Sequence, residues 1–280
     1  MSNRIDVKKT YKLYINGAFP RTESGRTYEV KNAKGVFVAN PCLASRKDLR
    51  DAVVAARAAH SGWSKATAYN RGQILYRIAE MLEGRRGQFV EEIINVTGAT
   101  KAKAEKEVTD SVDRLVWYAG WTDKIASLAG STNPVAGPFY NFTIPESIGV
   151  VAAIAPEAPS LLGLIDAVAP IITSGNTVVV LASTKAPLSA MTFAEVLATS
   201  DLPAGVVNIL TSKKDEIAPW MASHMDIDAM DISGMKSKQH AELKIAGAEN
   251  LKRIYSFKSV DPGRIIAFME AKTVWHPIGL

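Results

Sequence analysis

Residues 148–181 read IGVVAAIAPEAPSLLGLIDAVAPIITSGNTVVVL, and this stretch decides the fold. Its apolar pattern predicts a strand over Gly149–Ile154, a helix over Ser160–Ser174 and a second strand over Thr177–Leu181. The second strand is a continuous apolar run, which suits a strand covered on both faces of a sheet. A strand, a helix and a strand in this order indicate a parallel pair joined by a helical crossover.

The same alternation continues downstream of this unit. Strands are predicted at Val206–Leu210, Ile227–Ile232 and Leu251–Tyr255, with helices at Ser189–Ser200, Lys214–Ser223 and Lys236–Ala248. The fold class is therefore α/β, with a Rossmann-like, doubly wound parallel sheet. Nucleotides commonly bind at the carboxyl ends of such strands, although the fold alone does not establish a function.

Upstream, the first 135 residues are mostly helical after a short strand region. Tyr11–Ala18 alternates around Asn16-Gly17 and predicts a hairpin. Ser45–Asp48 is a capping-box pattern at a helix start, and Gly98 is a helix stop. Apolar residues at helical spacing predict buried helix faces at Ile74, Ile78, Met81 and Leu82, then at Phe89, Ile93 and Ile94, and then at Val108, Val112, Leu115, Val116 and Ala119.

The composition excludes several classes of protein. The chain has 280 residues, 47% hydrophobic and 22% charged, with a net charge of +5, which is typical of a globular protein. Its basic residues form no stripe interleaved with aromatics, so nucleic acid is not an expected partner. The longest apolar stretch, Ile148–Ile165, is broken by Gly, Pro and Glu157, so no membrane span is expected. The first residues lack the apolar core of a secretory signal, and Cys42 is the single cysteine, so we expect a cytoplasmic protein.

A series of short motifs resembles the aldehyde dehydrogenase superfamily in order from Tyr11 to Ile254. They are LYING at 13–17, AVVAARAAHSGWS at 52–64, RGQIL at 71–75, VTG at 96–98, YAGW at 118–121, IGVV at 148–151, SGNTVV at 174–179, LPAGVVN at 202–208 and NLKRI at 250–254. Each is weak alone, and jointly they are specific. The resemblance implies a nucleotide-binding fold and NAD(P)-dependent oxidation of aldehydes as the family activity.

The family's catalytic residues are missing at the matching positions. The loop that carries the family's oxyanion-stabilising Asn reads Pro156–Ser160 here, with Ala158 at the Asn position. Losing one such donor costs about 3–4 kcal/mol of transition-state stabilisation. Phe257 stands near the general-base Glu, and the domain with the nucleophilic Cys is absent. The resemblance therefore predicts no catalytic residue and a chain that is not an enzyme.

The family's cofactor site is also altered. The positions of its ribose-binding Lys and Glu hold Leu181 and Thr184, and its glycine and phosphate-loop positions hold Ser212, Met235 and Gln239. Four residues remain as vestigial cofactor-binding candidates, namely Pro156, Lys185, Ser233 and Gly234. We therefore expect no bound cofactor, with NAD(P) binding left as a possibility for an eroded site.

The sequence also gives little support for a reactive thiol, a metal site or an acidic catalytic cluster. Cys42 is predicted to be inert, because a reactive thiol needs a base beside it. The four histidines have no metal-ligand spacing, so no metal is expected. Glu107, Asp110 and Asp113 have helical spacing and are interpreted as a solvated face.

Both parts of the family's assembly device are recognisable. Phe139–Ile144 alternates like the hairpin that precedes the family's nucleotide fold, and Phe268–Trp275 (FMEAKTVW) resembles its C-terminal oligomerisation strand. The expected domains are a nucleotide-binding domain at 1–135 and 148–260, and an oligomerisation hairpin and strand at 136–147 and 264–280. Loss of the catalytic domain should also uncover an apolar face.

Three functional interpretations follow. The first is a non-catalytic subunit, acting in assembly or regulation as a homo-oligomer or a hetero-oligomer with a full-length aldehyde dehydrogenase. The second is an NAD(P)-binding module or weak NAD-dependent aldehyde oxidoreductase. The third is a degenerate gene product, which the ordered pattern and the retained tail disfavour.

Overall fold

The structure, a computed structural model, describes residues 9–279. Residues 1–8, on which the expectation about a secretory signal depends, lie outside the described residues, as does Leu280.

The central sheet is parallel and five-stranded, in the order β7-β6-β5-β8-β9. Its strands are β5 (Val150–Ile154), β6 (Thr177–Leu181), β7 (Val207–Leu210), β8 (Ala229–Asp231) and β9 (Arg253–Tyr255). The chain builds outward from β5 to β7, then returns to place β8 on the other side of β5. This is the doubly wound order that the sequence predicts.

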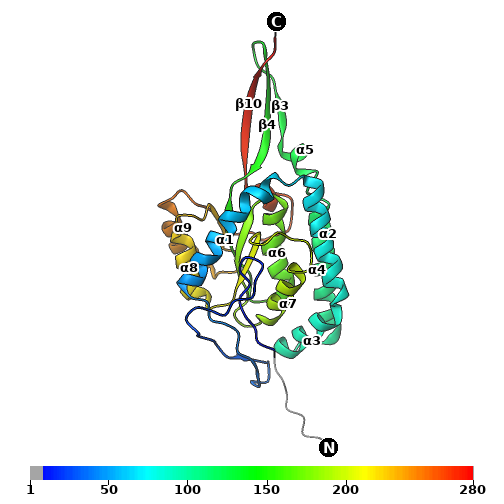
Figure 1. The fold of residues 1–280 in the computed structure, drawn as a ribbon, viewed down its shortest axis with the longest axis vertical. Coiled ribbons are helices and arrows are strands. Elements are labelled where there is room, and N and C mark those ends of the chain that lie inside the picture. The colour runs from blue at the N-terminus through cyan, green and yellow to red at the C-terminus, as the bar shows by residue number, and fades with distance from the viewer. Residues whose placement is uncertain (1–8, 280) are drawn as a thin grey trace, which may run out of the picture.

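Helices cover both faces of this sheet (Figure 1). One face carries α1 (Arg46–Lys65), α8 (Lys214–Ser223) and α9 (His240–Ala248), the last preceded by the 3-10 turn η1 (Ser237–Gln239). The other face carries α6 (Ser160–Thr173) and α7 (Leu188–Leu197), and behind them lie α2 (Ala68–Gly84), α3 (Arg86–Thr97) and α4 (Lys101–Ala119). The shorter elements are α5 (Ile125–Ala129), α10 (Gly263–Ile266) and the antiparallel pair of β1 (Val30–Lys31) and β2 (Phe37–Ala39).

Successive residues of the sheet feed two separate cores. In β5, Val151 and Ala153 pack toward α6 and α7, whereas Val150, Ala152 and Ile154 pack toward α1 and α8. Side chains alternate across a strand, so a strand buried on both faces must be apolar throughout. All five residues of β5 are fully buried, which explains the unbroken apolar runs and confirms the α/β class.

A second sheet, here called the arm, projects from the body (Figure 1). It consists of β3 (Ser131–Asn133), β4 (Phe139–Ser147) and β10 (Met269–Pro277), in the order β10-β4-β3. β10 pairs with β4 along its full length, from Met269 opposite Ser147 to Pro277 opposite Phe139. The segments on either side of the nucleotide-type fold are thus joined in one antiparallel sheet.

The local signals at helix ends are confirmed. Ser45 accepts the N–H of Asp48 while the Asp48 carboxylate accepts the N–H of Ser45, a complete capping box. Gly98 ends α3 with a φ of 71°, a left-handed conformation that glycine adopts at little cost.

The hairpin expected at Tyr11–Ala18 forms as a tight turn, in which Ile15 and Ala18 exchange both backbone hydrogen bonds around Asn16 and Gly17, which have positive φ. Tyr14 also pairs with Ile209 at the edge of the central sheet. Two other local expectations are wrong. Val116 is 40% exposed rather than part of the buried stripe of α4. The helix expected from Lys236 starts as the η1 turn.

Glu107 also departs from expectation, because it is not part of a solvated face. Its carboxylate accepts the N–H of Leu161 at 2.8 Å and faces the N–H groups of Ser160 and Leu162. It therefore caps the N-terminus of α6 from α4, which favours its charged form. Burial is the larger effect, and it raises the pKa of the Glu107 carboxyl above its ordinary value of 4.5.

Because the pKa of Glu107 is raised in the folded state, its protonation stabilises the fold as the pH falls. That contribution is fully present below about 4.5, the unfolded value, and is lost as the pH rises through the folded value. We expect Glu107→Gln to remove this dependence, so the difference in unfolding free energy between variant and wild type should change across that window. Urea unfolding at several pH values measures it, with the exposed Glu105→Gln on the same helix as control. A flat difference for Glu107→Gln would contradict the assignment.

Candidate functional site

The candidate site is the crevice between the carboxyl ends of β5 and β8, here called the switch crevice. These two strands are neighbours in the sheet, but the chain leaves them toward opposite faces. Open α/β sheets bind ligands at such a point because the diverging loops leave space between them. The loops are Ala155–Pro159 after β5 and Ile232–Lys236 after β8.

Lys214, at the start of α8, spans this crevice. Its buried ammonium donates hydrogen bonds to Ala155 O at 2.6 Å and Gly234 O at 3.3 Å, and pairs with Glu157 Oε1 at 2.9 Å. It thereby joins the loops after β5 and β8. A buried ammonium is tolerated only when paired and hydrogen-bonded, and all of these partners come from the crevice itself.

The pKa shifts of this pair follow from its environment. Burial lowers the pKa of the Lys214 ammonium, and the Glu157 carboxylate offsets part of that effect. For Glu157, burial alone would raise the pKa, but hydrogen bonds from Lys214, from the N–H of Lys185 and from Ser183 outweigh it and leave the pKa lowered. The lowered pKa of Glu157 favours its carboxylate form, and the Lys214–Glu157 pair lines the larger cleft described below.

A second ion pair closes the other side of the crevice. Asp231, the last residue of β8, is 1% exposed and accepts a 2.9 Å bond from Arg264 Nη2. Arg264 comes from α10, in the short connection that follows β9, and its guanidinium lies 4.8 Å from the ring centroid of Phe257. Arg114 pairs with Asp166 in the same region, and burial, as the largest effect, raises the pKa of Asp166.

Two cavities remain around these ion pairs. The larger, a cleft of about 450 Å³, is lined by side chains of both charge signs. These are Glu157, Lys185, Lys213, Lys214, Asp215, Glu216 and Lys236, with Thr184, Gly234, Met235 and Gln239 between them. The smaller cavity, about 210 Å³, lies beside the Arg264–Asp231 pair.

The four vestigial cofactor candidates are divided between these cavities. Lys185 and Gly234 line the larger cleft, whereas Pro156 and Ser233 line the smaller cavity. The structure thus brings them together in pairs and not as one site. Their part in cofactor binding stays a prediction.

Three of these candidates also have a packing role. A Cβ on Gly234 would lie 2.3 Å from the carbonyl oxygens of both Ile154 and Ala155, so only glycine fits. Ser233 Oγ hydrogen-bonds Asp231 and accepts the N–H of Phe257. Pro156 packs onto Gly163, where a Cβ would meet its ring at 2.3 Å. Lys185, in contrast, is exposed at the rim of the cleft.

The positions at which the sequence departs from the family pattern are tied into the protein interior. Leu181 and Ser212 are fully buried, and Met235 is 9% exposed in the core beneath α8. Thr184 donates to Ser212 O at 2.8 Å, and Gln239 donates to Asp215 Oδ1 at 2.9 Å. These side chains stabilise the loops around the crevice.

The rim of the switch crevice is polar. The larger cleft is rimmed by Lys185, Lys213, Asp215, Glu216 and Lys236. Within residues 9–279, no large apolar side chain from the loops around the switch crevice is among the exposed ones. The apolar exposure is found mainly on other elements, including the arm.

The single cysteine and the residue near the general-base position are both held by packing contacts, and Phe257 also lines the smaller cavity. Cys42 is buried beneath α1, and its carbonyl accepts a bond from Thr211. Phe257 packs its ring against Tyr255 and Phe268. In the described part of the chain, no three His, Cys, Asp or Glu side chains are grouped in a way that could hold a metal ion. None of the helices within residues 9–279 has the length and apolar character needed to cross a membrane.

Comparison with known proteins gives the family. The sequence model of the aldehyde dehydrogenase family matches residues 20–256. Retinal dehydrogenase 2 of Gallus gallus is 34% identical over 255 residues, covering 89% of this chain and 48% of that protein. Mitochondrial 10-formyltetrahydrofolate dehydrogenase of Mus musculus is 32% identical, over 90% of this chain and 28% of that protein. The chain belongs to the aldehyde dehydrogenase family, and spans half or less of the length of these relatives.

Solved structures agree with this assignment. The NAD+ complex of an aldehyde dehydrogenase from Bacillus cereus superposes with a TM-score of 0.82 at 27% identity, covering 88% of this chain and 50% of that one. A salicylaldehyde dehydrogenase from Pseudomonas putida G7, complexed with salicylaldehyde, gives a TM-score of 0.83 at 25% identity over 88% of this chain and 51% of that one. The Rossmann-like fold therefore follows a known architecture.

Sequence reasoning missed both ion pairs of the switch crevice. Lys214 and Arg264 resemble ordinary surface cations in the sequence, and their partners lie far along the chain. The only available signal was the position of Lys214, two residues after the altered position Ser212 in the loop that follows a buried strand.

Removing Arg264 should strongly destabilise the protein, because Asp231 would be left as a buried, unpaired carboxylate. We expect Arg264→Gln to lower the unfolding free energy by about 3–5 kcal/mol, and the double variant Asp231→Leu/Arg264→Met to recover much of that loss. Urea unfolding provides the measurement. The control is Lys272→Gln, which breaks the exposed 3.0 Å pair with Glu146 and should cost about 0–1 kcal/mol. An Arg264→Gln loss no larger than the control's would show that the buried pair is not needed.

Proposed function

We propose that this protein is a non-catalytic aldehyde-dehydrogenase-like subunit that acts in assembly or regulation, with itself or with a full-length aldehyde dehydrogenase. The observation that carries the proposal is the arm, which projects from the body and exposes apolar side chains. The Lys214–Glu157 and Arg264–Asp231 pairs support it, because charged side chains already occupy the crevice in which a ligand would bind.

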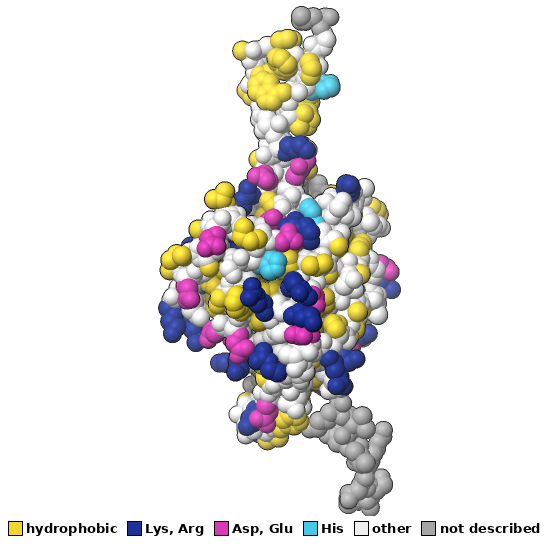
Figure 2. Space-filling model, turned by 60° about the vertical axis from the view of Figure 1, so that its left-hand side comes forward, with side chains coloured by type: hydrophobic (Ala, Val, Ile, Leu, Met, Phe, Trp, Pro, Cys, Tyr) yellow, Lys and Arg dark blue, Asp and Glu magenta, His cyan; other side chains and the backbone are white. Residues whose placement is uncertain are grey.

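The surface of the arm is unusually apolar for exposed structure. Phe139, Tyr140, Trp275 and Ile278 are 40%, 47%, 59% and 52% exposed, and the rings of Phe139 and Trp275 touch edge to face at 5.8 Å. Figure 2 shows hydrophobic side chains gathered toward the end of the arm. A cluster of exposed apolar side chains on a projecting element favours binding to another protein, because the contact would remove this apolar surface from water.

The arm also has open edges. β10 and β3 are its outer strands, and β10 has nine residues paired on one side only among residues 9–279. An exposed edge of that length can add a strand from another chain, with backbone hydrogen bonds for affinity and the aromatic side chains for specificity. A second subunit is therefore the partner that the arm fits best.

The residues at the family's catalytic positions support the proposal that this chain does not catalyse aldehyde oxidation. Ala158, in the exposed loop before α6, has a methyl group where the family has an oxyanion donor. Phe257 occupies the region of the general base, and its ring is held by Tyr255 and Arg264. The one thiol, Cys42, is buried.

Native mass spectrometry tests the proposal, on the protein alone and co-expressed with a full-length aldehyde dehydrogenase from the same genome. We expect a defined homo- or hetero-oligomer, which Trp275→Asp should dissociate, with at least a tenfold weaker association, because a charge would be placed in an apolar contact. Leu251→Asp is the matched control, since Leu251 is 89% exposed on the body and already at positive φ, where Asp is tolerated. A monomer in both preparations, or equal effects of both variants, would refute the proposal.

A second candidate function is an NAD(P)-binding module. The cleft of about 450 Å³ favours it, since Lys185 and Lys236 have no ion-pair partner among the described residues and could meet phosphates. Against it stand the acidic side chains Asp215 and Glu216 in the same lining. We expect calorimetric titration with millimolar NAD or NADP to give no heat and no thermal shift. Binding that Lys185→Gln weakens would establish the module instead.

A further inference from the structure

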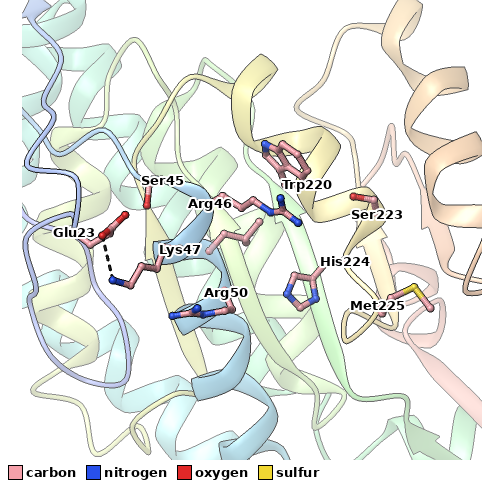
Figure 3. A pocket seen from close by; sticks show the side chains of 10 residues that line it. Glu23, Ser45, Arg46, Lys47, Arg50, Trp220, Ser223, His224 and Met225 are labelled. Carbon is pink, nitrogen blue, oxygen red and sulfur yellow. Dashed lines mark hydrogen bonds and ion pairs between the residues drawn. The ribbon is translucent and has the colours of Figure 1, made fainter.

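A third hollow of the surface, here called the α1–α8 cleft, lies away from the switch crevice. It is a cleft of about 680 Å³ between the start of α1 and the end of α8. Figure 3 shows its side chains, with Arg46, Lys47 and Arg50 from α1 on one side and Trp220 and His224 from α8 and the following turn on the other. Its volume lies within the range of small-molecule sites.

The cleft has an excess of positive charge. Three cationic side chains, on Arg46, Lys47 and Arg50, line it together with one carboxylate, on Glu23, which leaves two positive charges. Glu23 pairs with Lys47 at 3.2 Å, and Arg50 bonds the neighbouring Asp51 through an exposed pair that contributes little. Lys and Arg side chains also gather on the face that Figure 2 turns toward the viewer.

Arg46 is the cation best placed for a ligand. Its guanidinium lies 4.0 Å from the ring centroid of Trp220, and no carboxylate among the described residues pairs with it. Stacking on an aromatic ring fixes the plane of a guanidinium and leaves its N–H edge free for a bidentate anion. The guanidinium is therefore oriented before any anion arrives.

The start of α1 makes the arrangement electrostatically unusual. Cations in the first turn of a helix are unfavourable, because the N-terminal end of the helix is itself positive. The first turn of α1 nevertheless holds two cations, Arg46 and Lys47, against the single carboxylate of Asp48, and the N–H groups of Arg46 and Lys47 have no hydrogen-bond partner within residues 9–279. An anion in the cleft would relieve this repulsion.

His224 adds a neutral donor. Its Nδ1 accepts the N–H of Asp226 at 3.2 Å, and burial, opposed in part by the Asp226 carboxylate, lowers the pKa of the His224 ring. The neutral ring with Nδ1 as acceptor carries its proton on Nε2, so that nitrogen can donate. The carbonyl of His224, at the negative end of α8, is already neutralised by the Lys252 ammonium at 2.9 Å.

From these features we infer that the α1–α8 cleft binds a small organic phosphate, held by Arg46, Arg50 and His224. A phosphate monoester carries about two negative charges and has oxygens for bidentate arginine contacts, which matches the charge of the lining. Trp220 and Met225, which are 43% and 67% exposed, offer apolar surface to the organic part. The site lies apart from the switch crevice, and the inference does not rest on the subunit role.

Calorimetric titration of the full chain with pyrophosphate and with adenosine 5′-monophosphate tests the inference. We expect both to bind, with the monophosphate tighter because of its organic group. Arg46→Gln/Arg50→Gln should weaken the binding of both probes by at least tenfold. Binding should also change the tryptophan fluorescence of the protein, and Trp220→Phe should remove that change. Lys185→Gln, in the other cleft, should leave binding unchanged.

Three outcomes would overturn the inference. One is the absence of heat with either probe at millimolar concentration. Another is binding that Lys185→Gln weakens and Arg46→Gln/Arg50→Gln does not, which would place the phosphate in the larger cleft beside the switch crevice. The last is a response to an oligoglutamate peptide without any response to the phosphates, which would make the cleft a docking site for acidic protein segments. Circular dichroism of each variant verifies that it is folded.

Discussion

A carboxylate that is almost completely buried must be neutralised, and much of this structure follows from how Asp231 meets that requirement. Its partner, Arg264, comes from a short helix in the connection between the central sheet and the arm. The pair therefore fixes the path of that connection as well as the charge. Ile265, within α10, and Phe268, directly after it, are fully buried. The connection that carries Arg264 is therefore part of the core. Asn176 adds to this by bonding both Gly149 N and Phe268 O.

The same physical logic applies on the other side of the switch crevice. Lys214 bonds carbonyls at the ends of two strands, and Glu157 balances its charge. In a doubly wound fold these strand ends are the place for a ligand. Here protein side chains provide charges and hydrogen bonds at these strand ends. The loops after β5 and β8 are thereby tied together within the body from which the arm projects.

The sequence predicted the sheet well because the signals for strands and helices are local. Thr177–Leu181 and Lys214–Ser223 have the predicted bounds, since an unbroken apolar run and a following polar turn leave little freedom. The Arg264–Asp231 pair and the cap that Glu107 forms on α6 could not be predicted, because Arg264 lies 33 positions from Asp231 and Glu107 lies 54 positions from Leu161. A charged side chain on a helix has the same appearance in a sequence whether water or a distant helix end neutralises it. The turn at Asn16-Gly17 was recognised, but its partner strand was not, because pairing with Ile209 depends on the tertiary fold.

The join between β9 and β10 has a consequence for how chains of this architecture can vary in length. Arg253, at the start of β9, bonds Met269 O at 3.1 Å and Glu270 Oε1 at 2.8 Å. The chain thus leaves the sheet and returns to the arm at nearly the same point in space. The entropy of closing a loop grows only with the logarithm of its length, and neighbouring ends tolerate inserted domains. A segment of any size, from a short turn to an entire domain, can therefore occupy this junction without disturbing the register of β4 and β10.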